Sequence, residues 1–308
     1  MTFQTQASKF MQTIATRQQD PVRANTLSTY KSLLNARILP VLGGLDLSEV
    51  KNGVVKRFFE GLRGKLSPST QRTVFNIIKQ VVESAVNEEG DQLYPLKWNH
   101  AFIDVPTVKT AEQDAPIVSP KAIQNAIRTA RNEDKALYAL LAGSGLRVGE
   151  ALALCIGPDD DRNSFWQPET KTLTIRTTVV KGKIQTGTKT QAGIRAVDLS
   201  EELNVFLTKS LSHCETGLLF KSEKGGIVRT NTAYEHLEEA GIQEGFHAFR
   251  RFRLTHLDAV GVPQGLQRYW GGHSAGDVHE SYVKMGEKIL ERKDWAQKAG
   301  LGFQLEAV

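Results

Sequence analysis

Apolar residues in the first third of this 308-residue chain recur every three or four positions, which is the spacing of an amphipathic helix. Asn25 or Thr26 can cap the second helix of this pattern, and Pro40 is expected to end it. Ser67 followed by Pro68 is a typical start for the fourth helix. The pattern predicts an all-α unit over residues 1–95, with helices at about 1–20, 24–39, 51–64 and 67–88.

Helical periodicity is lost over residues 96–115, whose mixed charge and proline content indicate a linker between two folded units. The second unit, residues 116–308, begins with helical spacing again. Residues 165–199 are instead rich in β-branched side chains with glycines between them, and predict two or three antiparallel strands. The predicted fold class is therefore mainly α with a small antiparallel β-sheet, an α+β arrangement. Further helices are expected over 119–132, 135–144, 200–212 and 230–240.

Positive charge is unevenly distributed over these elements, although the formal net charge of the whole chain is only +5. Two stretches, Gly61 to Val82 and Thr170 to Ala196, contain no acidic residue. Basic faces of this kind suit contacts with the phosphates of a nucleic acid. The alternatives are an ordinary solvated helix face in the first stretch and lysines protecting an exposed strand edge in the second. The candidate DNA-binding residues are Arg63, Lys65, Arg72, Lys79, Lys181 and Lys183.

The cysteine content and the apolar segments exclude several classes of protein. Cys155 and Cys214 are the only cysteines and lie in apolar stretches, so we expect core residues in a reducing compartment. No CxxC or HExxH spacing offers a metal site, and no cofactor is expected. The N-terminus lacks the pattern of a signal peptide, and no apolar stretch is long enough to span a bilayer. We therefore expect a cytoplasmic protein without a membrane partner.

The residues best suited to chemistry lie in the stretch Gly245–Lys284 and in an upstream segment, GSGLRVGE. The upstream glycines break a helix and restart it, and Glu150 can brace the arginine three residues before it. Each candidate also has a purely structural alternative, such as a surface ion pair for the arginines or an amphipathic core position for the tyrosine. The candidates are Arg147, His247, Arg250, His273 and Tyr282.

Together these side chains suit phosphoryl transfer without a metal. A phosphodiester is already anionic, and guanidiniums keep their charge while offering a planar fork of donors to its oxygens. Arg147 and Arg250 are the candidates for that role. Tyr282 could attack phosphorus if its phenol loses a proton, which His247 can accept while His273 positions or shares it. A lysine of the basic hairpin could protonate the departing 5′-hydroxyl.

The order and spacing of these residues resemble the pattern of the tyrosine recombinase family, which includes phage-type integrases and Xer-type recombinases. The family pattern is an arginine in a TGLRxxE-like segment, a hairpin lysine, an HxLR-like motif, a GHS motif and a tyrosine. Here these are GSGLRVGE, a lysine-bearing hairpin, HAFR, GGHS and SYVKM, with Tyr282 nine residues after His273. The resemblance covers about residues 20–300, and the first unit resembles the family's helical core-binding domain.

The resemblance implies a site-specific recombinase, an integrase of a phage or mobile element, with its catalytic domain in residues 116–308. It implies a C-shaped clamp on a double-stranded DNA core site and a covalent 3′-phosphotyrosyl intermediate. Strand exchange would pass through a Holliday junction in a homo-tetramer, formed from a monomer or weak oligomer in the absence of DNA. The protein would act in the cytoplasm of a bacterial or phage host, at the nucleoid.

The hairpin lysine is assigned by the same resemblance. The segment from Gly187 to Leu199 is similar to the family's KT…R hairpin, which favours Lys189, with Lys181 and Lys183 as rivals. Three positions depart from the family pattern: Gly271 replaces an apolar residue, Arg251 replaces a frequent histidine, and CIGPDDDR replaces the usual strand entry. These departures concern local packing, and the catalytic set is unaffected.

Two other functions use the same residues differently. A nicking-closing enzyme similar to the type IB topoisomerases would have the same chemistry without strand exchange. A non-catalytic DNA-binding protein would keep the scaffold without needing Tyr282. Residues 286–300 predict an amphipathic helix, which could dock on a neighbouring protomer or pack on its own domain.

Overall fold

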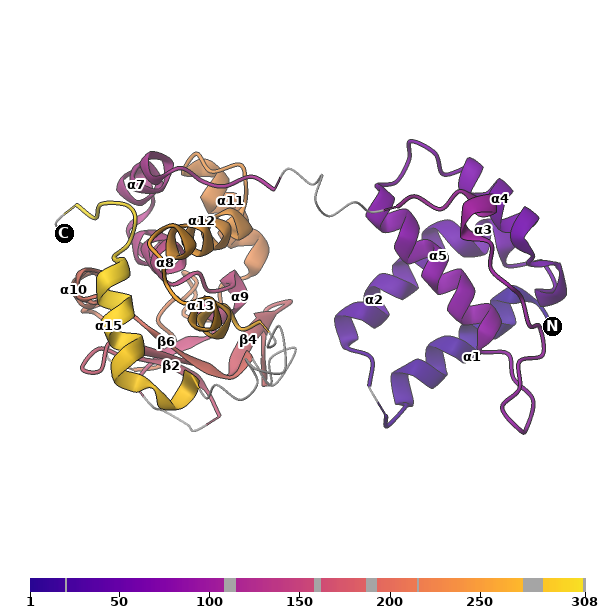
Figure 1. Cartoon of the computed structure of the whole chain (residues 1–308), viewed down its shortest axis with the longest axis horizontal. Helices are drawn as coiled ribbons and strands as arrows, with labels where there is room; N and C mark the ends of the chain where they lie inside the picture. The colour runs from indigo at the N-terminus through magenta and orange to yellow at the C-terminus, as the bar shows by residue number, and fades with distance from the viewer. Residues whose placement is uncertain are drawn as a thin grey trace. The chain divides into compact units, whose positions relative to one another are not determined.

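The computed structural model of the protein divides the chain into two compact units, Met1–Gln113 and Asp114–Val308, each with its own hydrophobic core (Figure 1). The structure describes residues 1–19, 21–107, 115–157, 162–186, 193–214, 216–273 and 285–306. Lys189 and Tyr282, two of the predicted catalytic residues, lie outside these ranges. Within the described ranges, no helix is long and apolar enough to cross a membrane.

The first unit is built of helices whose apolar faces meet in one core. The longest helix, α5 (Pro68–Glu83), buries seven side chains, and α1 (Phe3–Thr16) packs against it. Ser67 caps α5 as predicted, because its hydroxyl accepts a hydrogen bond from the Thr70 N–H at 3.3 Å. The other helices of the unit are α2 (Ala24–Leu33), α3 (Leu39–Leu42), α4 (Asn52–Glu60) and α6 (His100–Ile103), with a 3₁₀ turn at Leu47–Glu49.

The prediction that Pro40 ends the second helix is wrong. A π-helical turn, Leu34–Ile38, follows α2, and the chain then continues as helix through Pro40. Pro40 lies in the first turn of α3, where a missing N–H costs nothing, and the wider π turn separates it from the preceding helix. The predicted cap is also wrong, because Arg23 is the N-cap of α2 and makes no side-chain capping bond.

The first unit extends beyond residue 96, where the sequence predicted the linker to begin. Ile103 and Val105 are buried in the core of the first unit, and Trp98 packs against that core. The indole N–H of Trp98 donates to the Glu83 carboxylate at 3.1 Å, and the His100 ring lies 4.8 Å from that of Phe75. Residues 98–105 therefore belong to the first unit. The apolar positions of this segment are too irregular to predict a helix, yet Ile103 and Val105 are buried in the core of the first unit.

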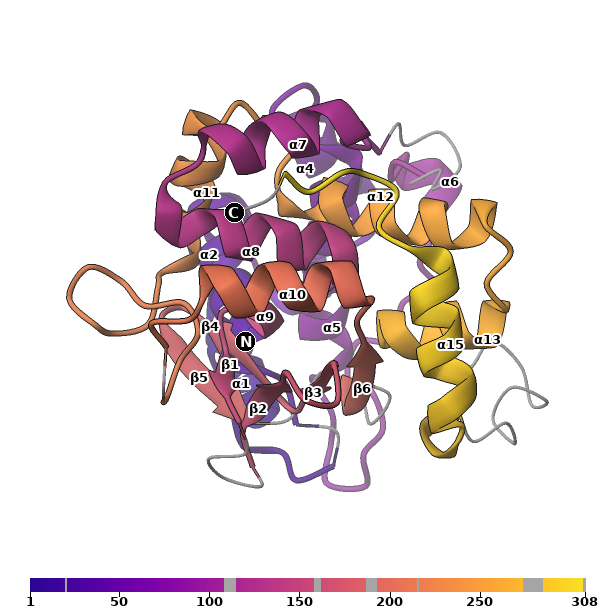
Figure 2. The same cartoon turned by 90° about the vertical axis from the view of Figure 1, so that its left-hand side faces the viewer.

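In the second unit α8 (Asn132–Ser144) is buried along most of its length. Figure 2 shows it between α7 (Pro120–Thr129) and α10 (Glu201–Ser210). These two helices and α12 (Phe246–Ala259) pack against it. In the described part of this unit the remaining helices are α9 (Val148–Ala151), α11 (Thr230–Glu239), α13 (Gln264–Gly271) and α15 (Ile289–Ala299), with a 3₁₀ turn at Met285–Glu287. Ser119 caps α7, which lies within the predicted helix range of 119–132.

The β structure is larger than predicted and is not purely antiparallel. A four-stranded sheet has the order β1-β2-β3-β6, in which β1 and β2 are parallel and the other pairs are antiparallel. A separate hairpin pairs β4 with β5. The strands are β1 (Leu154–Ile156), β2 (Ser164–Gln167), β3 (Thr172–Ile175), β4 (Thr177–Val180), β5 (Lys183–Thr186) and β6 (Arg195–Asp198). The sequence prediction missed β1 because three apolar residues after a helix carry no alternation.

Candidate active site

Arg147 lies at the break between α8 and α9. Gly145 ends α8 in the left-handed conformation, with a φ of 72°, which glycine adopts without steric cost. The backbone N–H of Arg147 then donates to Glu150 Oε2 at 3.0 Å, and its Nη1 donates to Oε1 at 2.9 Å. The predicted brace is therefore present. Because the Glu150 side chain is only 3% exposed, this contact is not an ordinary surface ion pair.

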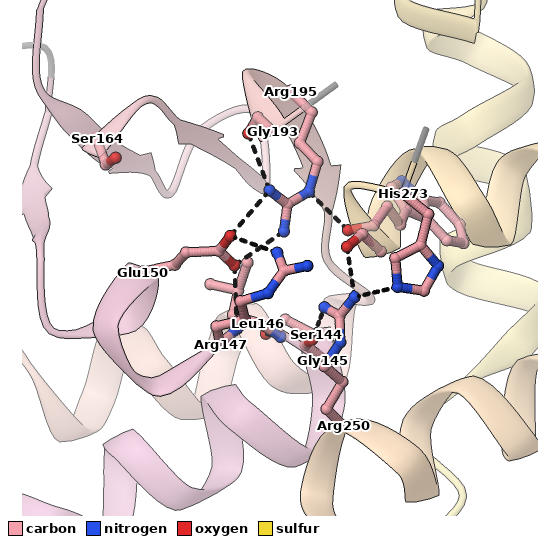
Figure 3. A network of polar contacts seen from close by, with 12 residues as sticks. Ser144, Gly145, Leu146, Arg147, Glu150, Ser164, Gly193, Arg195, Arg250 and His273 are labelled. Carbon is pink, nitrogen blue, oxygen red and sulfur yellow. Dashed lines mark hydrogen bonds and ion pairs between the residues drawn. The ribbon is translucent and has the colours of Figure 1, made fainter. Parts of the chain in front are cut away.

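Glu150 binds a second guanidinium at the same time (Figure 3). Arg195, the first residue of β6, places Nη2 3.0 Å from Oε2 and Nη1 3.3 Å from Oε1. Burial alone would raise the pKa of the Glu150 carboxyl, but Arg195 and Arg147 outweigh it and hold that pKa below its usual value. Glu150 is therefore a charged carboxylate shared by two arginines.

Arg250 joins three separate parts of the second unit. Its Nη1 donates to the Gly145 carbonyl at 2.8 Å, and its Nη2 donates to the Gly271 carbonyl at 2.5 Å. The same Nη2 lies 2.8 Å from Nε2 of His273, which follows the end of α13 (Figure 3). Burial and the charge of Arg147 lower the pKa of Arg250 to about 10, so the guanidinium is still protonated at neutral pH.

Both histidines of the cluster have a pKa below the usual histidine value, which favours the neutral imidazole. A guanidinium can only donate, so Nε2 of His273 accepts from Arg250 and the proton of the ring is on Nδ1. Burial, followed by the charges of Arg250 and Arg147, lowers the pKa of His273. Burial and Arg250, Arg251 and Arg147 lower the pKa of His247, which lies one turn before Arg250 on α12. Neighbouring atoms partly desolvate the His247 ring, but the residue still reaches solvent and can accept a proton.

The structure therefore joins three of the six predicted catalytic residues by hydrogen bonds: Arg147, Arg250 and His273 are connected through Glu150, Gly145 and the end of α13. A fourth, His247, lies one turn before Arg250 on α12. Two guanidiniums beside neutral imidazoles can bind the oxygens of a phosphate and accept a proton.

The predicted DNA-binding residues are found in different local settings. In the first unit Lys65 and Arg72 are exposed, whereas Arg63 forms an ion pair with Asp104 at 2.7 Å. Lys79 lies 3.8 Å from Glu83. In the second unit Lys181 and Lys183 are exposed at the turn of the β4–β5 hairpin.

The sequence analysis did not single out Arg195, which lies in the acid-free stretch Thr170–Ala196 and is buried in the structure. Arg195 alternates with Ala196 along β6 and shares an inward face with the buried Val197. Strand periodicity could therefore have identified Arg195 as an inward-facing charge that needs a partner.

A second buried ion pair, Asp198 with Arg292 of α15, was also not predicted. Nε of Arg292 donates to Asp198 at 2.8 Å, and its Nη1 donates to the carbonyls of Met285 and Gly286 at 2.9 and 2.6 Å. The Trp270 indole donates to the same carboxylate at 3.0 Å. The described part of the C-terminal tail packs on its own unit, with Ala296, Ala299, Leu301 and Phe303 in the core.

No protein-family model and no curated protein sequence matches the chain. Its fold is nevertheless similar to that of solved tyrosine recombinases, which match over most of the chain. One is the Tn1549 transposon integrase in complex with transposon right-end DNA, with a TM-score of 0.69 and 18% identity. That match covers 89% of this chain and 92% of the integrase chain.

The lambda integrase gives the same result in two assemblies. The lambda integrase dimer bound to a COC′ core site matches over the whole of both chains, with a TM-score of 0.63 and 14% identity. The lambda integrase tetramer bound to a Holliday junction matches 89% of this chain and 78% of that one, with a TM-score of 0.64 and 14% identity. The protein therefore has the tyrosine recombinase fold.

Proposed function

We propose that the protein is a site-specific DNA recombinase that cleaves and rejoins DNA through a 3′-phosphotyrosyl intermediate. The observation that carries this proposal is the hydrogen-bonded cluster of Arg147, Arg250 and His273. These residues come from three segments that are far apart in the sequence, and they converge on a fold shared with integrases. A protein that only binds DNA does not need a buried arginine, Arg250, that donates a hydrogen bond to the ring of His273.

The proposed reaction exchanges one phosphodiester for another. The Tyr282 oxygen attacks the scissile phosphorus, the bond to the 5′-oxygen breaks, and a 3′-phosphotyrosyl bond forms. His247 accepts the phenol proton, and Lys189 donates a proton to the departing 5′-oxygen. Arg147 and Arg250 neutralise the charge that develops on the non-bridging oxygens. Attack by a 5′-hydroxyl of the partner strand reverses these steps and releases Tyr282.

The proposed partner is double-stranded DNA carrying a core recombination site, bound by a homo-tetramer during strand exchange. The lambda integrase tetramer on a Holliday junction supports this assembly by likeness of fold. Phosphate contacts would come from exposed cations such as Lys65 and Arg72 of the first unit and Lys183 of the hairpin. The protein would act in the cytoplasm, at the nucleoid of a bacterial or phage host.

A nicked suicide duplex tests the proposal; its sequence is chosen from the DNA that flanks the coding region, where the family resemblance leads us to expect inverted repeats around a short spacer. The nick lets the 5′-hydroxyl fragment diffuse away, so a covalent protein–DNA adduct accumulates. We expect the wild-type protein to form the adduct, Tyr282→Phe to form none, and Arg250→Ala to form it at least about 100-fold more slowly. An adduct that persists in Tyr282→Phe would refute the assignment of the nucleophile.

Two other outcomes would favour the other functions. Relaxation of supercoiled DNA without recombination between two sites would indicate a nicking-closing enzyme. Binding of the duplex by the wild-type protein without any adduct would leave only a DNA-binding role.

A further inference from the structure

Arg195 lies between the two halves of the proposed site, and the reaction described above gives it no role. Its side chain is fully buried, with 0% exposure, and each of its nitrogens donates a hydrogen bond (Figure 3). Nε donates to the Trp270 carbonyl at 2.7 Å, and Nη1 donates to the Gly193 carbonyl at 2.9 Å. The remaining donors bind both oxygens of Glu150.

On one side, Arg195 acts on Arg147 through Glu150. Arg147 is 43% exposed at its side chain, and Glu150 is the carboxylate that holds its Nη1 and its backbone N–H. The guanidinium of Arg195 donates hydrogen bonds to both oxygens of that carboxylate and so fixes the plane of the carboxylate. The direction of the Arg147 guanidinium therefore depends on Arg195.

On the other side, Arg195 acts on Arg250 and His273 through the end of α13. The Trp270 carbonyl binds Arg195, and the next carbonyl, that of Gly271, binds Arg250. Gly272 then turns the chain toward His273 with a φ of 62°, and a Cβ there would lie 2.8 Å from Nη1 of Arg195. The turn that carries His273 is thus packed directly on the Arg195 guanidinium.

We propose that Arg195 is a positioning residue, which sets Arg147 and the Arg250–His273 pair in their mutual geometry from one buried guanidinium. This inference rests on the proposed recombinase chemistry. Arginine is required because a lysine ammonium has no planar fork and cannot bind Glu150 twice while also reaching Trp270.

The test compares Arg195→Lys with wild type in single-turnover adduct formation at saturating DNA. The lysine keeps a positive charge beside Glu150, so we expect the fold to be retained while the planar fork of donors is lost. We expect the rate to fall by about 10–100-fold, because small displacements of catalytic groups have effects of this size. DNA affinity should be unchanged, since Arg195 is buried and cannot reach a phosphate.

A second substrate distinguishes positioning from a merely structural role. In a methylphosphonate at the scissile position, a methyl group replaces one charged oxygen. Less negative charge then develops in the transition state, so the reaction depends less on neutralisation by Arg147 and Arg250. If Arg195 acts through them, the loss caused by Arg195→Lys shrinks to a few-fold on this substrate. A loss of folded protein would lower both rates equally.

Asp134→Asn is the matched control. It weakens the contact of Asp134 with His236, 2.8 Å, which links α8 to α11 in the same unit. We expect a lower unfolding midpoint and an unchanged rate per folded molecule on both substrates. If Arg195→Lys does not fold, Gly272→Ala takes its place. Its added methyl group would lie 2.8 Å from Arg195 Nη1 and displace the guanidinium, while residue 195 stays an arginine.

Two results would overturn the inference. One is a rate for the tested variant within about twofold of wild type, well below the effect expected from misplacement. The other is an equal loss on the phosphate and methylphosphonate substrates. If the wild-type protein itself forms no adduct, the proposed function fails, and that failure is seen before any variant is compared.

Discussion

Glu150→Gln is the substitution that most directly tests the buried charge network. Glutamine has nearly the same volume as glutamate but carries no charge, and its amide nitrogen donates where the carboxylate accepted. In the wild-type protein both oxygens of Glu150 accept from Arg195, and both also accept from Arg147. The variant leaves the Arg195 guanidinium, which is 0% exposed at its side chain, without a counter-charge.

Removing one partner of a buried ion pair costs about 3–5 kcal/mol of the free energy of unfolding. Urea unfolding followed by tryptophan fluorescence measures this loss, because Trp166, Trp270 and Trp295 all lie in the second unit. With a slope of about 2 kcal/mol per molar urea, the midpoint of that unit should fall by about 1.5–2.5 M at pH 7.

The loss should depend on pH in a defined direction. The folded pKa of Glu150 lies below its usual value, so its ionised form stabilises the fold above the unfolded pKa. That contribution is lost as pH falls through the folded value. The difference between wild type and Glu150→Gln should thus be constant near neutrality and shrink below about pH 4. A difference under about 1 kcal/mol at pH 7, or one that persists unchanged at pH 3, would refute a net stabilising ion pair.

Three further predictions concern the base, the DNA contacts and the second buried pair. If His247 accepts the tyrosine proton, the rate of adduct formation should rise with pH through a midpoint below the usual histidine value of about 6.5 and be level at pH 7–8. The reason is that burial and neighbouring arginines lower the pKa of His247. A midpoint above about 6.5 in the pH–rate profile would contradict this role. DNA affinity measured against salt should fall with a log–log slope of about −0.9 for each phosphate contact, and a flat response would exclude binding through phosphate contacts. Arg292→Met leaves the Asp198 carboxylate buried without its counter-charge and should lower the free energy of unfolding by about 3–5 kcal/mol in the same urea assay, whereas an unchanged midpoint would show that the pair adds no stability.

The helices of the first unit were predictable where the sequence carried a signal for the start and another for the buried face. Ser67 and the following proline gave the start of α5, and its apolar stripe gave the buried face. The prediction failed at Pro40, because a π turn has no periodicity of its own and depends on how the surrounding helices pack. It also failed at Ile103 and Val105, which are buried through tertiary contacts that no local pattern announces.

The candidate site was predictable in its local pieces and not in its connections. The Arg147–Glu150 brace follows from a spacing of three residues on a helix start. Contacts between Arg195 and Glu150, or between Asp198 and Arg292, cross 45 and 94 residues of sequence. A buried arginine and a surface arginine look alike in composition, so the stretch Thr170–Ala196 was interpreted as a basic surface, although its Arg195 is buried.

The glycine pair after Trp270 shows how these buried arginines shape the backbone around them. Gly271 departs from the apolar residue that the family pattern favours, yet a Cβ there would meet Arg250 Nη2 at 3.4 Å, an ordinary contact distance. At Gly272 a Cβ would fall 2.8 Å from Arg195 Nη1, and the left-handed backbone adds about 1–2 kcal/mol of strain for any other residue. The constraint on this turn therefore lies at Gly272, and it is imposed by a guanidinium rather than by hydrophobic packing.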